Sequence, residues 1–225
     1  MCSRYNLVSA PEAVRAWFGL AAIEDFPPRP DIRPTEPVAI VRNAPSGRRE
    51  LRLVRWGLIP AWTKDPSRIS LFNARVETAA EKPSFRGSFR HRRCLLPADG
   101  FYEWTGPPRA RQPVLFRPRG GGLLALGGLH EHWLGADGSE IETTAILTVP
   151  ANTTVAPVHD RMPLLLPREA FGCWLDCRSG DQHVVEDLLV PAPDDLLEAL
   201  PVDPAPGRRR PDIPDLLDGI TPLPR

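Results

Sequence analysis

Short apolar segments separated by turn residues constrain the fold of this chain more than any other feature of its sequence. Asn43–Gly47 has the composition of a turn, and the alternating segment Glu50–Trp56 that follows is typical of the second strand of a hairpin. Asp99-Gly100, Gly120–Gly122 and Asp137-Gly138 mark further turns. Strands are therefore predicted near residues 37–42, 50–56, 94–98, 101–104, 113–117, 123–133 and 142–149.

Fewer segments favour helices. Ser9-Ala10-Pro11-Glu12 fits a capping box with proline in the first turn. A helix over about 11–21 would then place apolar side chains on one face, at Val14, Trp17, Phe18 and Ala21. Further helices are predicted shortly after Thr78 and near residues 167–176 and 181–189.

Length and composition indicate one sizeable domain. The chain has 225 residues, of which 42% are hydrophobic and 25% charged. Prolines and charged clusters dominate from Pro191 onward, so we expect a domain over residues 1–190 and a proline-rich extension over 191–225, in which only Asp215–Ile220 can pack. No run approaches the ~20 apolar residues of a membrane span, and no basic-then-apolar leader precedes Cys2. We therefore expect a cytoplasmic protein with no membrane contact.

Charge is unevenly distributed along the sequence, although the chain holds 28 basic and 28 acidic residues. Residues 42–119 contain 17 basic and 6 acidic groups, a net charge of +11, whereas residues 120–225 contain 7 and 17, a net charge of −10. A basic block inside a neutral protein is typical of a surface for a polyanion such as a nucleic acid, and an ordinary solvated face is the alternative.

The N-terminal hexapeptide Met-Cys-Ser-Arg-Tyr-Asn places a cysteine at position 2. If Met1 is removed, Cys2 carries a free α-amine beside its thiol. The amine of such a 1,2-aminothiol condenses with an aldehyde to an imine, and the sulfur then closes a five-membered thiazolidine ring. The unperturbed pKa values of the amine and the thiol are about 7.7–8.0 and 8.5, so both groups are partly nucleophilic near neutral pH. A cysteine without function at this position is the alternative.

Three other residues admit two interpretations each. Glu103 lies among aromatic residues, where a carboxylate is either paired with an arginine or held for proton transfer with a raised pKa. His159 is either a half-buried proton-transfer group or a structural histidine bonded by Asp160. Trp62, like Trp56, either packs in the core or a loop, or stacks on an unpaired base.

The four cysteines do not form the framework of a disulfide-rich protein. Cys173, Cys177 and His183 have a C-x3-C-x5-H spacing that allows a zinc site, but no fourth ligand is evident. The two cysteines are four residues apart in a helical pattern. We therefore interpret them as structural and predict no metal site.

Five motifs occur together and in order in this chain, and together they are specific where each alone would be weak. The motifs are Met-Cys-Ser-Arg-Tyr at the start, Trp-Gly-Leu-Ile-Pro-Ala-Trp at 56–62, Asn-Ala-Arg-Val-Glu-Thr at 73–78, Pro-Ala-Asp-Gly-Phe-Tyr-Glu-Trp at 97–104 and His-Asp-Arg-Met-Pro at 159–163. With these motifs the chain resembles the SOS-response-associated peptidase family, abasic-site sensors that crosslink to single-stranded DNA. The resemblance extends from residue 2 to about residue 190.

The resemblance implies an α+β fold, namely a single β-rich domain with a barrel-like antiparallel sheet, peripheral helices and a basic groove for single-stranded DNA. It implies that Met1 is removed and that Cys2 reacts with the ring-opened aldehyde of an abasic site, forming a stable thiazolidine. By the same resemblance Asn73 would hold the crosslinked sugar, and Glu103 and His159 would transfer protons. No metal or organic cofactor is required, and a monomer is the default.

The resemblance also implies which residues contact DNA. Arg4 and Arg75 would hold the flanking phosphates, Trp62 would act as a wedge or stacking residue, and Thr148 would line the site. Two segments depart from the family pattern: Asp31–Thr35 stands where the family has Asn before a small-residue-Pro-Thr stretch, and Val202–Arg210 replaces an Asn-containing strand. No DNA contact is assigned to either segment.

The residue types fit this chemistry independently of the family. Imine formation needs a proton delivered to a departing hydroxyl, ring closure needs one removed from the thiol, and a carboxyl and an imidazole can share both transfers. Arginines supply phosphate contacts that ignore sequence and weaken with salt. The leading hypothesis is therefore a protein that covalently shields abasic sites in single-stranded DNA, with strand cleavage by β-elimination as a second outcome of the same imine.

Two other functions remain open at this point. Cys2 is alternatively an N-terminal nucleophile that hydrolyses a peptide or amide bond, with its own amine or His159 as the base. Such an amidase needs oxyanion donors beside Cys2, whereas the DNA hypothesis needs a basic groove there. A third hypothesis is a non-enzymatic single-strand binder in which arginines and tryptophans act and Cys2 is idle.

Overall fold

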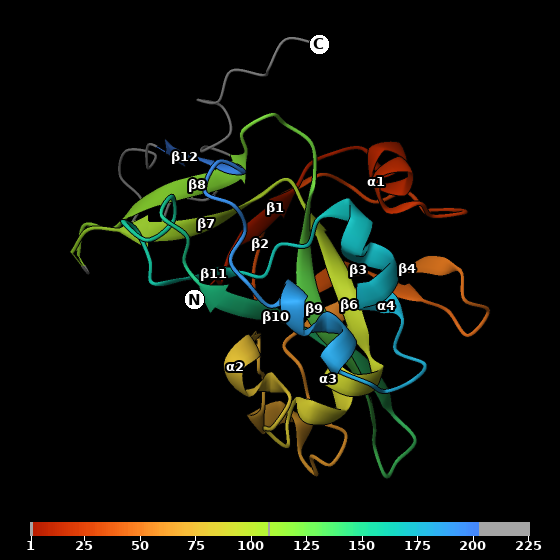
Figure 1. Cartoon of the computed structure of the whole chain (residues 1–225). Helices are drawn as coiled ribbons and strands as arrows, with labels where there is room; N and C mark the ends of the chain where they lie inside the picture. Colours follow the sequence, from red (N-terminus) through yellow and green to blue (C-terminus); the bar gives the residue numbers. More distant parts are fainter. Residues whose placement is uncertain (1, 108, 203–225) are drawn as a thin grey trace.

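Two β-sheets form the body of the protein, whose computed structural model describes residues 2–107 and 109–202 (Figure 1). The larger sheet has the order β11-β10-β4-β3-β6-β9, and β5 also pairs with β10. Its strands are β3 (Pro37–Asn43), β4 (Arg49–Trp56), β5 (Asn73–Arg75), β6 (Arg93–Ala98), β9 (Leu124–Leu134), β10 (Glu140–Pro150) and β11 (Arg161–Pro163). The smaller sheet has the order β12-β8-β7-β1-β2, with β1 (Tyr5–Leu7), β2 (Arg29–Ile32), β7 (Gly100–Thr105), β8 (Gln112–Pro118) and β12 (Leu197–Pro201).

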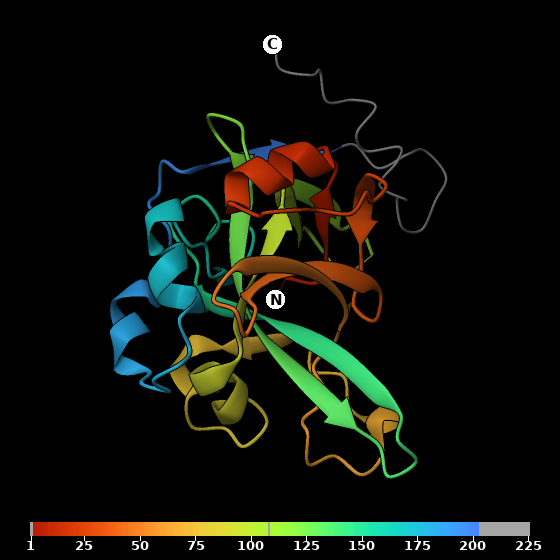
Figure 2. The same ribbon diagram turned by 90° about the vertical axis from the view of Figure 1, so that its right-hand side faces the viewer.

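The larger sheet closes into a barrel because β10 pairs with β9 along one edge and with β4 along the other. Strands β3, β4, β6, β9 and β10 thereby form a closed ring. This confirms the α+β fold class with a barrel-like sheet. Most of the pairings are antiparallel, as expected, but β10 runs parallel to both β4 and β5. Figure 2 shows the β9–β10 hairpin continuing beyond the barrel, beside the segment that contains η1 (Pro66–Arg68).

Short helices lie around the two sheets rather than between them (Figures 1 and 2). They are α1 (Pro11–Phe18), α2 (Val76–Ala79), α3 (Arg86–His91), α4 (Phe171–Leu175) and two further 3-10 helices, η2 (Arg168–Ala170) and η3 (His183–Leu188). The helix predicted for 11–21 ends at Phe18 because Gly19 adopts a left-handed conformation with φ of 66°. The segment 181–189, predicted as a helix, forms a 3-10 helix instead of an α-helix.

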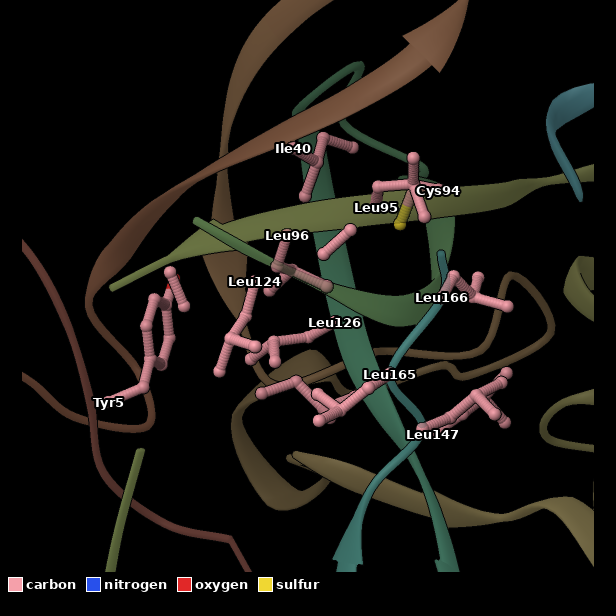
Figure 3. Packing of buried hydrophobic residues seen from close by; sticks show 14 of the residues in the cluster. Tyr5, Ile40, Cys94, Leu95, Leu96, Leu124, Leu126, Leu147, Leu165 and Leu166 are labelled. Carbon is pink, nitrogen blue, oxygen red and sulfur yellow. The ribbon is translucent and has the colours of Figure 1, made fainter. Parts of the chain in front are cut away.

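Apolar side chains from both sheets and α1 share one core. Figure 3 shows part of it, where Tyr5 of β1 lies beside leucines of β6 and β9. Trp56 is fully buried, with its ring edge-on to Tyr5 at 5.3 Å and its indole N–H donating to the carbonyl of Phe72 at 2.8 Å. Trp56 therefore packs in the core, and of the two motif tryptophans only Trp62 remains available for stacking.

The predicted capping box of α1 is wrong. Ala10 is the N-cap residue, and no side chain caps the helix. Ser9 instead bonds to Asp99, through its backbone N–H at 2.9 Å and through its hydroxyl. A contact between residues distant in the sequence therefore replaces the local hydrogen bond that the motif predicted.

The predicted turn at Asp99-Gly100 does not join paired strands. Strand β6 pairs with β3 and β9 in the barrel, whereas β7 pairs with β1 and β8 in the smaller sheet. The chain therefore passes from one sheet to the other at this point. The two strands nevertheless meet at Asp99-Gly100, as the sequence predicted.

Part of the predicted C-terminal extension belongs to the smaller sheet. Strand β12 pairs with β8 over five residues, from Leu197 opposite Pro118 to Pro201 opposite Val114. The amide of Asn152 also donates to the carbonyls of Ala192 and Pro193. The expected packing of Asp215–Ile220 lies outside the described residues.

Glycine at position 100 is required by a close approach between strands. A Cβ atom at Gly100 would lie 2.6 Å from the backbone oxygen of Phe116 and 2.9 Å from a methyl group of Leu115. We predict that Gly100→Ala lowers the free energy of unfolding by about 1–3 kcal/mol, because backbone cannot move aside as a flexible side chain can. Chemical denaturation checks this against Gly120→Ala, where a Cβ atom meets nothing within 4 Å. Equal stability of the two variants would contradict the strain argument.

Candidate active site

Cys2 lies in the protein core, and its side chain has no exposed surface. Its thiol donates to the carbonyl of Arg4 at 3.6 Å. Burial raises the pKa of the Cys2 thiol, and the nearby carboxylate of Glu103 acts in the same direction. The thiol is therefore held in its neutral form, and a base must remove its proton before the sulfur can attack.

Asn73 fixes the backbone of Cys2. Its side-chain amide donates to the Cys2 carbonyl at 2.7 Å. Asn73 begins β5, which lies parallel to β10 with Asn73 opposite Ile146. The other amide atom of Asn73, Oδ1, is buried and has no hydrogen-bond partner within the described residues. Since a buried amide oxygen without a partner is costly, a ligand hydroxyl is a natural partner for it.

Glu103 lies on β7, where pairing with β1 brings it beside the N-terminal segment. Tyr5 is opposite Phe101, and Asn6 is opposite Gly100. Glu103 is 3% exposed, and this burial raises its pKa to about 7, with the carboxylate of Asp160 contributing in the same direction. A carboxyl group with this pKa is present in both its acid and base forms at neutral pH, which suits it to proton transfer in both directions.

His159 lies in the turn between β10 and β11, and its side chain is 26% exposed. Its Nδ1 atom accepts the backbone N–H of Arg161 at 3.0 Å and lies 3.0 Å from a carboxylate oxygen of Asp160. Partial burial lowers the pKa of His159. In the neutral ring, Nδ1 accepts from Arg161 and Nε2 carries the proton; in the charged ring, Nδ1 can donate to Asp160 instead.

Arg161 joins two of the sequence motifs. Its guanidinium binds both carboxylate oxygens of Glu77 and the backbone oxygen of Thr148, and the residue is 8% exposed. This pair lowers the pKa of Glu77 through the hydrogen bonds from Arg161. It holds the start of α2 against β10 and β11, and so fixes the segment of Asn73 relative to that of His159. The sequence did not single out Glu77 and Arg161 for this positioning role.

The predicted DNA-contacting residues differ in exposure. Arg75 is exposed, and Trp62 is 61% exposed, with its indole N–H 3.4 Å from the carbonyl of Pro83. Thr148 is fully buried, and its hydroxyl donates to the carbonyl of Ala74 at 3.4 Å. The structure thus brings Thr148 close to the Asn73 strand, while Arg75 and Trp62 face outward. Their DNA contacts stay predictions.

Arg4 is 8% exposed, and its guanidinium binds the carboxylate of Asp31 at 2.8 and 3.0 Å. It also lies over the ring of Trp104, 5.6 Å from the ring centroid. Asp31 belongs to the segment that departs from the family pattern, and its role in this chain is to hold Arg4. The phosphate contact predicted for Arg4 stays a prediction.

Arg111 was not identified from the sequence. It is exposed and immediately precedes β8, where Gln112 lies opposite Thr105 of the strand that carries Glu103. Its positive charge acts on both Glu103 and His159, lowering the pKa of each. Its place beside a strand that carries a candidate acid was the available signal.

In the described part of the chain, no group of three or more histidine, cysteine or carboxylate side chains is arranged to hold a metal ion. The thiol of Cys173 is directed to the carbonyl of Val184 at 3.2 Å. No helix in the same residues is long and apolar enough to cross a membrane.

The fold is thus a β-barrel protein in which Cys2 is buried near the start of the chain and Asn73 binds its carbonyl. A family model described as "SOS response associated peptidase (SRAP)" matches residues 1–208, and the chain belongs to this family.

Relatives and solved structures agree with this assignment. The chain is 33% identical over 223 residues to "Abasic site processing protein YoqW" of Bacillus subtilis, covering 97% of this chain and 99% of that protein. It is 35% identical over 159 residues to "Abasic site processing protein HMCES" of Xenopus tropicalis, covering 60% of this chain and 48% of that protein. A crystal structure from Bordetella bronchiseptica has a TM-score of 0.78 and 30% identity, covering 90% of this chain and all of that one. One from Bacteroides thetaiotaomicron, at 24% identity, shares the fold with a TM-score of 0.80 over 90% of this chain and 92% of that one.

Asp160 favours the protonated forms of both Glu103 and His159. We predict that Asp160→Asn lowers the pKa of both groups, because a negative charge near each is removed. NMR titration of the His159 ring checks the histidine, and carboxyl-carbon shifts check Glu103. Asp25→Asn, at an exposed position away from the site, serves as the control. An unchanged or raised His159 pKa would contradict this arrangement.

Proposed function

We propose that this protein processes abasic sites in single-stranded DNA by forming a thiazolidine crosslink through Cys2, once Met1 has been removed. One observation carries the proposal: the Cys2 backbone is held by Asn73 while its thiol is buried near Glu103, whose pKa is about 7. The names of the relatives in Bacillus subtilis and Xenopus tropicalis, as abasic site processing proteins, support the same reaction class.

The reaction begins at the amine. The α-amine of Cys2 adds to the C1 aldehyde of the ring-opened sugar, and the resulting hydroxyl leaves as water after it receives a proton, which gives the imine. The thiol sulfur then attacks the imine carbon, its proton is taken by a base, and the imine nitrogen gains a proton. The products are the thiazolidine and one water molecule. Fixing the amine, thiol and aldehyde together makes the ring closure effectively unimolecular.

Glu103 and His159 are assigned the proton transfers. Protonated Glu103 can donate a proton to the leaving hydroxyl, and ionised Glu103 can accept the proton of the thiol. Both forms are available because the pKa of Glu103 is about 7. The lowered pKa of His159 keeps its ring neutral at neutral pH, so it can act as a base or relay on the same path. The Oδ1 atom of Asn73, which has no hydrogen-bond partner among the described residues, is assigned a hydroxyl of the opened sugar.

The DNA strand is assigned to the surface beside β5 and α2. Arg75 is exposed there and offers a phosphate contact, and the exposed Trp62 offers a face on which an unpaired base can stack. Thr148 supports this surface from beneath through Ala74. Arg4, held by Asp31, contacts DNA only if a phosphate approaches its guanidinium beside Trp104.

The family description includes the word peptidase, so a hydrolase with Cys2 as nucleophile is the second candidate. A catalytic cysteine of this kind is normally activated by a lowered thiol pKa. Burial and Glu103 do the opposite to Cys2. A reaction that starts at the amine does not need a thiolate at its first step, which favours the crosslinking reaction over hydrolysis.

Mutation can distinguish the role of the Cys2 α-amine from the role of its thiol. We predict that the native protein gives a denaturation-stable product with a single-stranded oligonucleotide bearing one abasic site. Cys2→Ala should give none, because it retains the amine but cannot close the ring. With borohydride present, however, Cys2→Ala should be trapped as a reduced imine. Without borohydride it should cleave the strand more than the native protein does, because the imine acidifies the adjacent sugar carbon.

A version that retains one extra residue before Cys2 is the matched control, since it keeps the thiol but moves the amine away. It should give neither the stable product nor the trapped imine. A stable product with this version, or with Cys2→Ala, would refute the thiazolidine. Hydrolysis of a peptide substrate by the native protein, with no product on DNA, would instead support the peptidase.

Glu103 should control both the rate and the pH dependence of crosslinking. We predict that Glu103→Gln slows product formation by roughly 10²-fold or more, because the amide can neither give nor take the proton. The native rate should change with pH around 7, and this dependence should flatten in the variant. Single-turnover gels over pH 5–9 measure both effects. Glu81→Gln, an exposed carboxylate near α2, is the control; a native-like pH profile in Glu103→Gln would remove Glu103 from the mechanism.

A further inference from the structure

A cavity of about 610 Å³ lies between the β3–β4 turn, the junction of α3 with β6, and α4. Its lining includes none of Cys2, Asn73, Glu103 or His159. In Figure 1 the β3–β4 hairpin and α4 lie on the right of the molecule, whereas α2, next to the Cys2 site, lies on the left. The side chains that matter here are Arg42, His91, Arg92, Arg93, His130 and Arg178.

Arg93 places a buried positive charge in the wall of this cavity. It is 1% exposed, and all four hydrogen bonds of its guanidinium go to backbone carbonyls, those of Phe89, Arg90, Trp174 and Asp176. These carbonyls end α3 and α4, so the helix ends supply partial negative charge. The carboxylate of Asp176 is a full counter-charge close enough that the charge of Arg93 lowers its pKa, but Asp176 is also bound by Arg178. An anion in the adjacent cavity would add a second counter-charge.

The pKa of His130 reflects positive charges in the lining of the same cavity. The burial of this residue, together with the positive charges of Arg42 and Arg92, lowers its pKa to about 3. The ring is therefore neutral at physiological pH. It offers the cavity a polar group without adding or removing charge.

The arginines around the cavity are only partly engaged by carboxylates. Arg92 binds Glu131 through one terminal nitrogen at 2.8 Å, while its buried Nε has no hydrogen-bond partner among the described residues. Arg42 binds Glu50 and Glu142 through Nε and one terminal nitrogen, at 2.9 and 3.0 Å.

Asp176 is the carboxylate in the cavity wall, and it is already bound by Arg178 at 2.8 and 2.9 Å. Those hydrogen bonds lower the pKa of Asp176 to about 2, so it stays ionised and occupied. The lining itself carries four guanidinium groups and one carboxylate, while Glu50, Glu142 and Glu131 bind Arg42 and Arg92 from outside the lining.

We propose that this cavity binds a phosphate group, held by Arg42, Arg92 and Arg178 with His130 at its inner wall. Guanidinium groups match the oxygens of phosphate in both charge and geometry. The phosphate belongs either to a DNA strand or to a small free ligand. The site does not depend on any reaction at Cys2, so the phosphate-binding proposal can be tested independently of the crosslinking function.

Gly172 gives a direct test, because it lines the cavity and a Cβ atom there meets nothing within 4 Å. Gly172→Glu places a negative charge at the cavity, and Gly172→Gln adds a neutral side chain of the same size. We expect native protein and Gly172→Gln to bind inorganic phosphate saturably, detected through the ring resonances of His130 at constant ionic strength. Gly172→Glu should bind it roughly tenfold or more weakly, because like charges repel at short range.

The proposal would be overturned if both Gly172 variants bound phosphate equally well. It would also be overturned if native protein bound phosphate no more saturably than it binds chloride, the control ion. Arg178→Gln, with a largely exposed side chain, provides a second variant that should also weaken phosphate binding. DNA oligonucleotides of about 8 and 30 nucleotides identify the source of the phosphate. If Gly172→Glu binds the longer strand more weakly than native protein does, and the shorter strand equally well, the phosphate belongs to DNA. If Gly172→Glu binds both strands as native protein does but inorganic phosphate more weakly, the phosphate belongs to a small ligand. Crosslinking of a short abasic oligonucleotide should be the same in all variants.

Discussion

Strand β10 is the element on which the barrel and the candidate site both depend. Within the described residues it pairs with β9, β4, β5 and β11. Its pairing with β9 and β4 closes the barrel, while its pairing with β5 and β11 sets Asn73 opposite Ile146 and Pro163 opposite Thr148. A shift of one residue in a strand register turns every side chain to the other face. The register of one strand therefore fixes both the residue that holds Cys2 and the turn that carries His159.

Burial has the largest effect on the pKa values of the reacting groups, ahead of the charges near them. Burial raises the pKa of the Cys2 thiol and of Glu103 and lowers that of His159, so all three are driven toward their neutral forms. Such a site disfavours a resting thiolate. It suits a reaction in which a neutral amine attacks first and protons then move among neutral groups. The charged Glu77–Arg161 pair lies beside this site and positions its segments instead of taking part in proton transfer.

The sequence predicted those parts of the fold that local interactions determine. The hairpin of β3 and β4 and the long strands β9 and β10 are joined by short turns, and each was located within a few residues. Strands β1 and β5 have three residues each, too few for a periodic pattern, and the parallel pairing of β5 with β10 joins residues more than seventy positions apart. In the site, residue type and motif identified Cys2, Asn73, Glu103 and His159 as candidates. Asn73 binds the Cys2 carbonyl, and Asp31 binds Arg4. Both contacts join residues distant in the sequence, so no local sequence pattern predicts them.

The charge asymmetry of the sequence is partly resolved inside the fold. Arg42 pairs with Glu142, Arg92 with Glu131 and Arg117 with Glu198, so acidic residues of the C-terminal half neutralise arginines of the basic block. Such pairs are partly exposed and contribute little to stability, but they remove positive charge from the protein surface. Exposed basic residues outside these three pairs lie near α2 and α3, at Arg75, Lys82, Arg86 and Arg90, and also elsewhere, among them Arg48, Lys64, Arg111 and Arg119. The positive charge that a polyanion would meet comes from these remaining exposed side chains, so the number of basic residues in the block overstates it.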